Sequence, residues 1–76
     1  MAPPLPVVKG KEAVKAFQKA GWQIKTQKGS HVKLVKPGHP NPIIIPVHGN
    51  KTLDRGTLSS IIKHSDLSVE AFTDLL

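Results

Sequence analysis

Residues 22–36, WQIKTQKGSHVKLVK, decide the fold of this 76-residue chain. Apolar and polar residues alternate on both sides of a Lys-Gly-Ser centre, and this pattern predicts two half-buried strands joined by a tight turn. Gly29 can supply the left-handed backbone conformation that such turns use. A three-residue loop over 28–30 places Gln27 opposite His31, which keeps polar and apolar side chains on separate faces of the hairpin.

This register divides the expected hairpin into two faces. A two-residue loop over 28–29 would pair Thr26 with His31 and set apolar residues against polar ones, so we expect the three-residue loop. The face toward the helices should carry Ile24, Val32 and Leu34. The solvent face should carry Gln23, Lys25, Gln27, His31 and Lys33.

The segment before the hairpin is expected to form a helix over 10–20. Its apolar residues recur at helical spacing on one face: Ala13, Val14, Phe17 and Ala20. Gly21 follows at the point where helices commonly end in a left-handed residue. We expect a poorly capped start, because Lys9 and Gly10 offer no side-chain oxygen to the free N–H groups of the first turn.

The chain after the hairpin continues with a turn over 37–42, rich in proline, and a short strand over 43–45 that Pro46 closes. Prolines at both ends cannot donate to a strand ladder, which suits an edge strand. The expected order is therefore α-β-β-β-α-α. We predict an α+β fold with a three-stranded antiparallel sheet and helices packed on one face.

Two helices are expected in the remainder of the chain. One lies near 53–64, with Thr52 as its N-cap and Asp54 in its first turn. Ser68 caps a short last helix that has Glu70 near its start. The residues expected to face inward are Leu58, Ile61, Ile62, Val69, Phe72 and Leu75.

Length and composition narrow the class of protein. The chain allows a single domain, 1–76, with a Pro-containing N-terminal segment over 1–8, and folding at this size buries only about 60–65% of the unfolded surface. There is no cysteine, so neither a disulfide nor a thiolate metal site is expected, as in ordinary cytoplasmic proteins. No apolar run approaches the roughly 20 residues of a membrane helix, and the first six residues lack the features of a signal peptide. We expect a cytoplasmic protein without membrane association.

Positive charge is concentrated in the first half of the chain. The net charge is +6, and residues 1–38 hold eight lysines against one acidic residue, whereas the rest is close to neutral. Lys11, Lys15 and Lys19 follow one another at four-residue spacing on one helix face, where like charges cost about 0.2–0.5 kcal/mol per pair. Contact with a polyanion would account for both features. The alternative is a solvated lysine-rich surface.

Four histidines are candidates for acid–base chemistry, because an unperturbed imidazole titrates near pH 6.5. His31 follows the turn and lies among lysines, which suits proton transfer on RNA. His39 lies in a loop that we expect to be mobile. His48 follows the third strand, where it either makes a turn hydrogen bond or contacts RNA. His64 ends a helix, where a cation favours the helix dipole. His31, His39 and His48 lack metal-ligand spacing and have no carboxylate near them in sequence, so no metal site is expected.

The whole chain resembles the HicA toxin family of bacterial toxin–antitoxin pairs. The resemblance is carried, in order, by Leu5-Pro6-Val7-Val8, Gly10-Lys11-Glu12, Gly21-Trp22, Lys28-Gly29-Ser30-His31 with Lys33, Ile45-Pro46-Val47-His48, Gly56-Thr57-Leu58 with Ile61 and Ile62, and Leu67-Ser68 with Glu70 and Phe72. Lys9 departs from the family, which often has Ser or Thr there. The resemblance implies a double-stranded-RNA-binding-like fold, RNA cleavage with His31 as the catalytic residue, and a HicB-like antitoxin partner.

The sequence therefore predicts a metal-independent endoribonuclease acting on mRNA, without a cofactor. His31 would act as general base or acid. The residues expected to contact RNA are Lys25, Lys28, Gly29, Ser30, Lys33, Lys36 and His48. The main alternative is a non-catalytic RNA-binding module, because this type of fold also supports binding of duplex RNA through phosphates and 2′-hydroxyls. A third interpretation is an adaptor that binds only protein.

Overall fold

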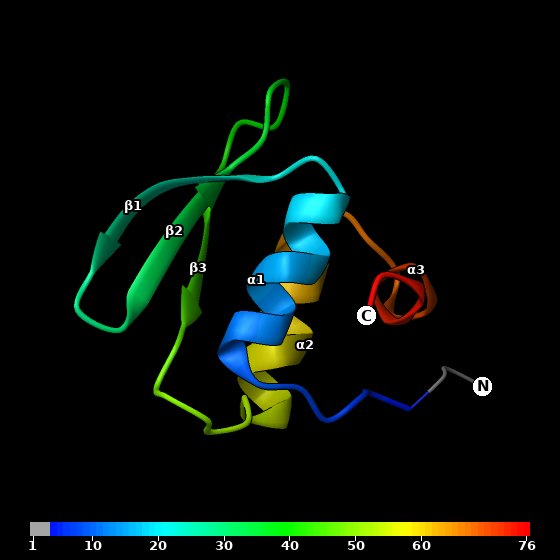
Figure 1. Cartoon of the computed structure of the whole chain (residues 1–76). Helices are drawn as coiled ribbons and strands as arrows, with labels where there is room; N and C mark the ends of the chain where they lie inside the picture. Colours follow the sequence, from blue (N-terminus) through cyan, green and yellow to red (C-terminus); the bar gives the residue numbers. More distant parts are fainter. Residues whose placement is uncertain (1–3) are drawn as a thin grey trace.

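The computed structural model describes residues 4–76, so residues 1–3 of the predicted N-terminal segment lie outside the described residues. The order is α-β-β-β-α-α, as predicted, and the fold class is α+β (Figure 1). The elements are α1 (Gly10–Lys19), β1 (Gln23–Lys28), β2 (His31–Val35), β3 (Ile43–Pro46), α2 (Arg55–His64) and α3 (Val69–Asp74). Within residues 4–76, no helix has the length and apolar character needed to span a membrane.

The sheet is antiparallel in the order β1-β2-β3, so β2 is the central strand. The predicted three-residue loop is wrong. Lys28 pairs with His31, and only Gly29 and Ser30 form the loop. Gly29 has the positive φ expected of it, +57°. Glycine at the first of two loop positions is typical of the hairpin turns whose twist matches that of the strands.

The shorter loop shifts the register by one residue from the expected pairing, and a β-bulge further along the hairpin removes this shift. The register shifts between Ile24 and Thr26, so that Lys25 is the extra residue and Ile24 lies opposite Leu34. The expected pairing is thus confirmed for Gln23 and Ile24 and is wrong for residues 26–28, between the bulge and the turn. Because directly opposed residues share a face, Gln27 lies on the side of Val32, not on the solvent face as predicted.

The two faces of β2 are separated as expected, whereas β1 is not. Val32 and Leu34 are buried, and His31 and Lys33 point to the other side. Every residue of β1 is exposed, and Ile24 retains 48% of its surface, so its predicted burial against the helices is wrong. Figure 1 shows the reason: the β1–β2 hairpin extends beyond the helices, which pack against β3 and the start of β1.

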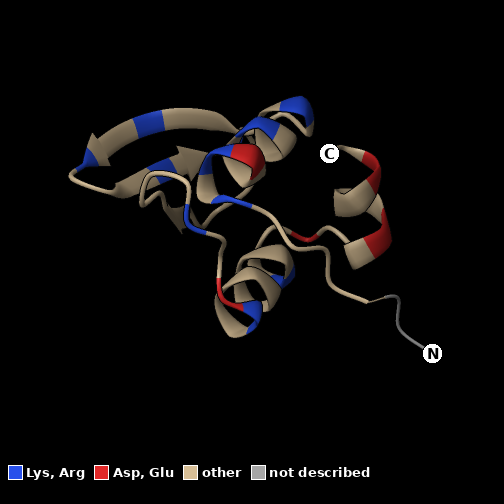
Figure 2. Ribbon diagram, turned by 60° about the horizontal axis from the view of Figure 1, so that its bottom comes forward, with Lys and Arg blue, Asp and Glu red and all other residues tan. Residues whose placement is uncertain are grey.

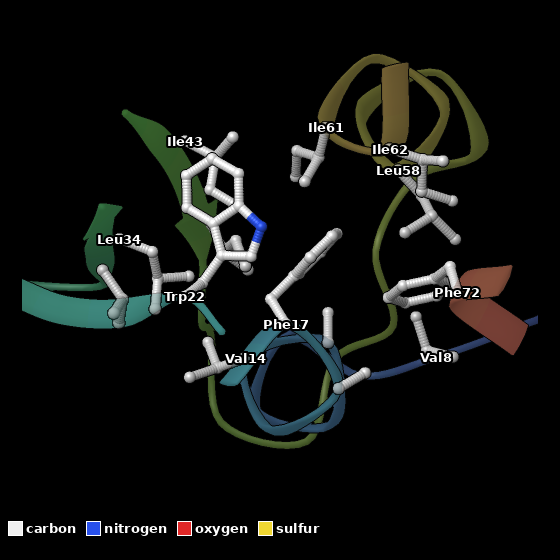
Figure 3. Packing of buried hydrophobic residues seen from close by; sticks show 14 residues of the cluster. Val8, Val14, Phe17, Trp22, Leu34, Ile43, Leu58, Ile61, Ile62 and Phe72 are labelled. Carbon is white, nitrogen blue, oxygen red and sulfur yellow. The ribbon is translucent and has the colours of Figure 1, made fainter. Parts of the chain in front are cut away.

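The core lies between the sheet and the helices. Phe17 projects from α1 toward the centre of the cluster, with Trp22 on one side and Phe72 on the other (Figure 3). The rings of Phe17 and Phe72 are 5.0 Å apart, and such aromatic pairs contribute about 0.5–1.5 kcal/mol beyond their burial. Phe72 therefore fastens the short helix α3 to α1. Val69 and Leu75, which were also expected to face inward, are partly buried.

The helix starts agree with expectation at two of three positions. The start of α1 has no side-chain cap, as expected, and Glu12 Oε1 instead accepts from the backbone N–H of the N-cap residue Lys9 at 2.8 Å. Asp54, not Thr52, is the N-cap of α2, and Thr52 forms a β-bridge with Lys9. Ser68 caps α3 as predicted, and its hydroxyl accepts from the N–H of Ala71.

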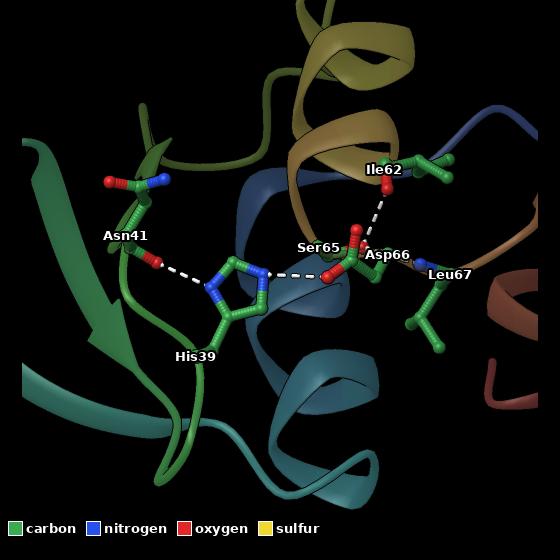
Figure 4. A network of polar contacts seen from close by, with 6 residues as sticks. All are labelled: His39, Asn41, Ile62, Ser65, Asp66 and Leu67. Carbon is green, nitrogen blue, oxygen red and sulfur yellow. Dashed lines mark hydrogen bonds and ion pairs between the residues drawn. The ribbon is translucent and has the colours of Figure 1, made fainter.

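The loop after β2 is fastened by His39, contrary to its expected mobility. Figure 4 shows the ring between Asn41 and Asp66. Nδ1 lies 2.8 Å from the Asn41 carbonyl oxygen, and Nε2 lies 3.0 Å from Oδ2 of Asp66. The ring also packs against Trp22, with 4.8 Å between ring centroids. His39 therefore has a structural role, which connects the loop to the turn after α2.

The junction of α1 with β3 predicts opposite effects for two glycine substitutions. A Cβ atom at Gly10 would collide with the carbonyl oxygen of Pro46 and lie 2.9 Å from Cα of Val47, whereas a Cβ at Gly56 in α2 would meet nothing within 4 Å. Gly10→Ala should lower the free energy of unfolding although alanine favours helices. Gly56→Ala should raise it by up to about 1 kcal/mol. Urea denaturation of both variants measures this, and equal effects would contradict the close packing at Gly10.

Candidate nucleic-acid interface

The solvent face of β2 carries the residue with the clearest chemical potential. His31 is the first residue of β2, and its backbone pairs with Lys28 on one side and Pro46 on the other. Its side chain is exposed, because burial of Val32 turns the neighbouring residues outward. Within the part of the chain that the structure describes, no hydrogen-bond partner holds the imidazole. The ring is therefore free to bind a ligand.

Lysines surround His31 on this face. A hollow is lined by Thr26, Lys28, His31, Lys33 and Ile44. The register explains the group, since Lys28 lies opposite His31, and Thr26 and Ile44 flank Lys33. Two ammonium groups and no carboxylate line the hollow, so it favours an anionic ligand. Thr26 and Ile44 were missed in the sequence, because the first depends on the bulge and the second on pairing with β3.

The fold brings His48 to His31, seventeen residues earlier in the chain. The centroids of the two rings are 6.3 Å apart, with the rings at 83° to each other. The pairing of β2 and β3 continues past Pro46, because the N–H of Val47 donates to the carbonyl oxygen of Ser30 at 2.6 Å. Alternation along this extended segment then places His48 on the same face as Pro46 and His31. We refer to His31, His48, Lys28 and Lys33 as the outer-face cluster.

A second hollow adjoins the cluster beyond His48. It is lined by Pro46, His48, Lys51, Thr52, Leu53 and Asp54. Lys51 and Asp54 were not predicted as site residues, and nothing in their sequence context marks them. The imidazole of His48 is exposed, and among residues 4–76 it has no hydrogen-bond partner. The turn hydrogen bond considered for His48 is therefore not formed by its side chain.

Of the other residues predicted to contact RNA, Gly29 and Ser30 lie beside the cluster, whereas Lys36 lies away from it. Gly29 and Ser30 form the turn beside His31, but the Ser30 carbonyl is already used by Val47. Lys25 is exposed in the bulge. Lys36 follows the far end of β2, five residues from His31, which is about 16 Å along a strand. Lys36 is half-buried against Gly21 and is not part of the cluster.

Basic and acidic residues are distributed unevenly over the helices and strands. Figure 2 shows lysines on the β1–β2 hairpin and along α1, whereas α3 carries only acidic charged residues. The lysine series of α1 lies on the helix layer, on the other side of the sheet from the outer-face cluster. Lys11 donates to Asn50 Oδ1 at 3.2 Å, and Lys19 donates to the carbonyl oxygen of Leu75 at 3.2 Å.

The remaining histidines stand apart from the cluster. His39 is held by Asn41 and Asp66, and His64 is the last residue of α2, as expected. Among residues 4–76, no three His, Asp or Glu side chains gather in a group able to hold a metal ion. The chemistry of the outer-face cluster is thus that of imidazole and ammonium groups, with the carboxylate of Asp54 in the adjoining hollow.

The fold and this face define a small α+β protein with a basic, histidine-bearing sheet surface suited to a polyanion. The family model for the HicA toxin of bacterial toxin–antitoxin systems matches residues 10–67, which include the sheet, α1 and α2. The chain belongs to this family. Its members are toxins and are generally ribonucleases that cleave mRNA. No curated protein matches the chain closely enough to be counted as a relative.

The turn at Gly29 positions His31 and gives a test of this geometry. A Cβ at Gly29 would meet nothing within 4 Å, so substitution there costs only backbone strain at φ +57°. We expect Gly29→Val to destabilise the protein by about 1–2 kcal/mol and to shift the backbone resonances of His31. Gly29→Asn should cost less, because asparagine tolerates this conformation. Equal stability of the valine variant and the unaltered protein, measured by denaturation, would contradict the assigned turn.

Proposed function

We propose that this protein is a metal-independent endoribonuclease that cleaves mRNA in the cytoplasm, with His31 as a general acid–base catalyst. The observation that carries the proposal is the exposed His31 imidazole, which has no hydrogen-bond partner among residues 4–76 and lies between Lys28 and Lys33 on the outer face of the sheet. Membership of the HicA toxin family supports the same activity. Neither a cofactor nor a metal is needed for this chemistry.

The two kinds of side chain serve different parts of the reaction. RNA cleavage begins when the 2′-hydroxyl loses its proton and attacks the adjacent phosphorus atom. An imidazole that accepts or donates a proton in such a step contributes about 10²–10⁴-fold to the rate. Lys28 and Lys33 supply fixed positive charge to the phosphate as its negative charge grows, which is the electrostatic part of catalysis.

The resemblance to the family also suggests the regulatory partner. We infer that a HicB-like antitoxin neutralises the toxin by covering its active site. On this chain that site is the outer-face cluster, where an antitoxin would bury His31 and meet Lys28 and Lys33 with acidic groups. Charge complementarity of this kind raises association rates and selects the partner.

Removal of the His31 imidazole should abolish cleavage and spare the fold. We expect His31→Ala to cleave purified RNA at least about 10²-fold more slowly in the presence of a chelator. Its stability should change by no more than about 0.5 kcal/mol, because the side chain is exposed. Gel analysis of the RNA and thermal unfolding measure the two quantities.

His64→Ala is the matched control, because His64 is exposed at the end of α2 and lies outside the cluster. It should cleave RNA as the unaltered protein does. Full activity of His31→Ala would refute the assignment. RNA binding by the unaltered protein without any cleavage would favour the non-catalytic RNA-binding module instead.

The lysines of the outer face should determine the salt dependence of RNA binding. Each phosphate neutralised by a lysine releases counterions, so affinity falls with salt concentration. Lys33→Ala should reduce the slope of log affinity against log salt by about one unit. Lys15→Ala, on the helix layer, should leave the slope unchanged. If Lys33→Ala leaves the slope unchanged, the RNA does not lie on the outer face, and an effect of Lys15→Ala would place it on α1.

A further inference from the structure

Cleavage of RNA by its own 2′-hydroxyl needs two proton transfers. One group removes the proton from the attacking 2′-oxygen, and another gives a proton to the leaving 5′-oxygen. His31 can serve only one of these oxygens at a time, since they lie on opposite sides of the phosphorus atom. The reaction proposed above therefore requires a partner for His31.

His48 is the titratable group that the fold brings beside His31. The ring centroids are 6.3 Å apart, and both rings project from the outer face. A hydrogen bond to a phosphate oxygen spans about 2.8 Å, so both imidazoles can reach oxygen atoms of one phosphate group placed between them. Lys28 and Lys33 on one side supply positive charge to a group bound there, and the hollow on the other side is lined by both Lys51 and the carboxylate of Asp54.

The surroundings of His48 differ from those of a structural histidine in this protein. Both ring nitrogens of His39 face acceptors, and its side chain is only 13% exposed. His48 is exposed, and among the described residues its ring has no hydrogen-bond partner. The backbone of this segment is held independently of the ring, by the bond from Val47 to Ser30 and by the bond from the Lys51 N–H to the His48 carbonyl oxygen. The fold does not need the imidazole of His48.

We propose that His48 is the second proton-transfer residue of the ribonuclease, acting on the oxygen that His31 does not serve; this inference rests on the function proposed above. One neutral imidazole takes the proton of the 2′-hydroxyl, and the 2′-oxygen forms a bond to phosphorus. The bond between phosphorus and the 5′-oxygen breaks, and the other ring, an imidazolium, protonates that oxygen. The products are a 2′,3′-cyclic phosphate and a 5′-hydroxyl, and each ring ends in the protonation state in which the other began.

The experiment compares two RNA substrates that differ only at the leaving atom. In one the leaving atom is the natural 5′-oxygen, and in the other it is sulfur. A thiolate leaves without a proton, because a thiol has a pKa of about 8.5, far below that of an alcohol. The full-length unaltered protein, His31→Ala, His48→Ala and the control His64→Ala are assayed on both substrates in the presence of a chelator. Thermal unfolding of each variant confirms that it is folded.

On natural RNA, both His31→Ala and His48→Ala should be slower than the unaltered protein by about 10²-fold or more. On the sulfur substrate, the variant that lacks the general acid should recover most of its activity, and the variant that lacks the general base should not. Added imidazole should partly restore His48→Ala, because its site is open to solvent. A ring that served only the structure or RNA binding would show neither form of rescue.

Three results would overturn the proposal. Cleavage of natural RNA by His48→Ala within a few fold of the unaltered protein would exclude a proton-transfer role for His48 while leaving His31 and the ribonuclease function in place. The same conclusion would follow if the loss in His48→Ala appeared only as weaker RNA binding. Failure of the unaltered protein to cleave either substrate would instead remove the proposed function and this inference with it.

Discussion

The constraint on which the rest of the structure depends is the burial of Val32 and Leu34, the two residues of the central strand β2 that face the helices. β2 is paired on both sides, so it cannot shift its register without breaking two ladders. A slip by one residue would expose its two apolar side chains and bury His31 and Lys33. The same burial that stabilises the core therefore holds the imidazole and the ammonium group toward solvent. Stability and the candidate chemistry are set by opposite faces of one strand.

A second constraint operates at the end of β3. Gly10 allows the start of α1 to approach Pro46 and Val47 closely, and the bond from Val47 to Ser30 extends the pairing of β3 beyond its last residue. Without this extension, His48 would be held only by the turn in which its carbonyl oxygen accepts from the Lys51 N–H. With it, the residue falls on the outer face beside His31. The packing of a helix against one end of a strand thus helps to bring the rings of His31 and His48 together from separate segments of the chain.

Buried and basic residues occupy opposite faces of the sheet, so the small core and the basic surface do not interfere with each other. The helices and the inner face of the sheet hold the buried residues, with Phe17 connecting α1 to α3 through Phe72. The outer face of the sheet carries no part of this core, so its lysines are not buried. Because water surrounds their ammonium groups, the repulsion between them is screened and weak. Substitution of these exposed side chains should affect ligand binding more than folding, because surface changes usually alter stability by no more than about 0.5 kcal/mol.

The sequence by itself determined the order and type of the elements, the outward direction of His31 and Lys33, the positive φ of Gly29 and the cap at Ser68. These features follow from periodicity and from local backbone preference, which neighbouring residues set. Only the tertiary structure decided the two-residue loop, the bulge at Lys25, the exposure of Ile24, the fixed position of His39 and the approach of His48 to His31. The loop and the bulge depend on how β1 pairs with β2, which the alternation of apolar and polar residues does not fix by itself. The last three depend on contacts between residues far apart in the chain. The helices reach only the start of β1, for example, and nothing in the sequence of β1 marks where this contact ends.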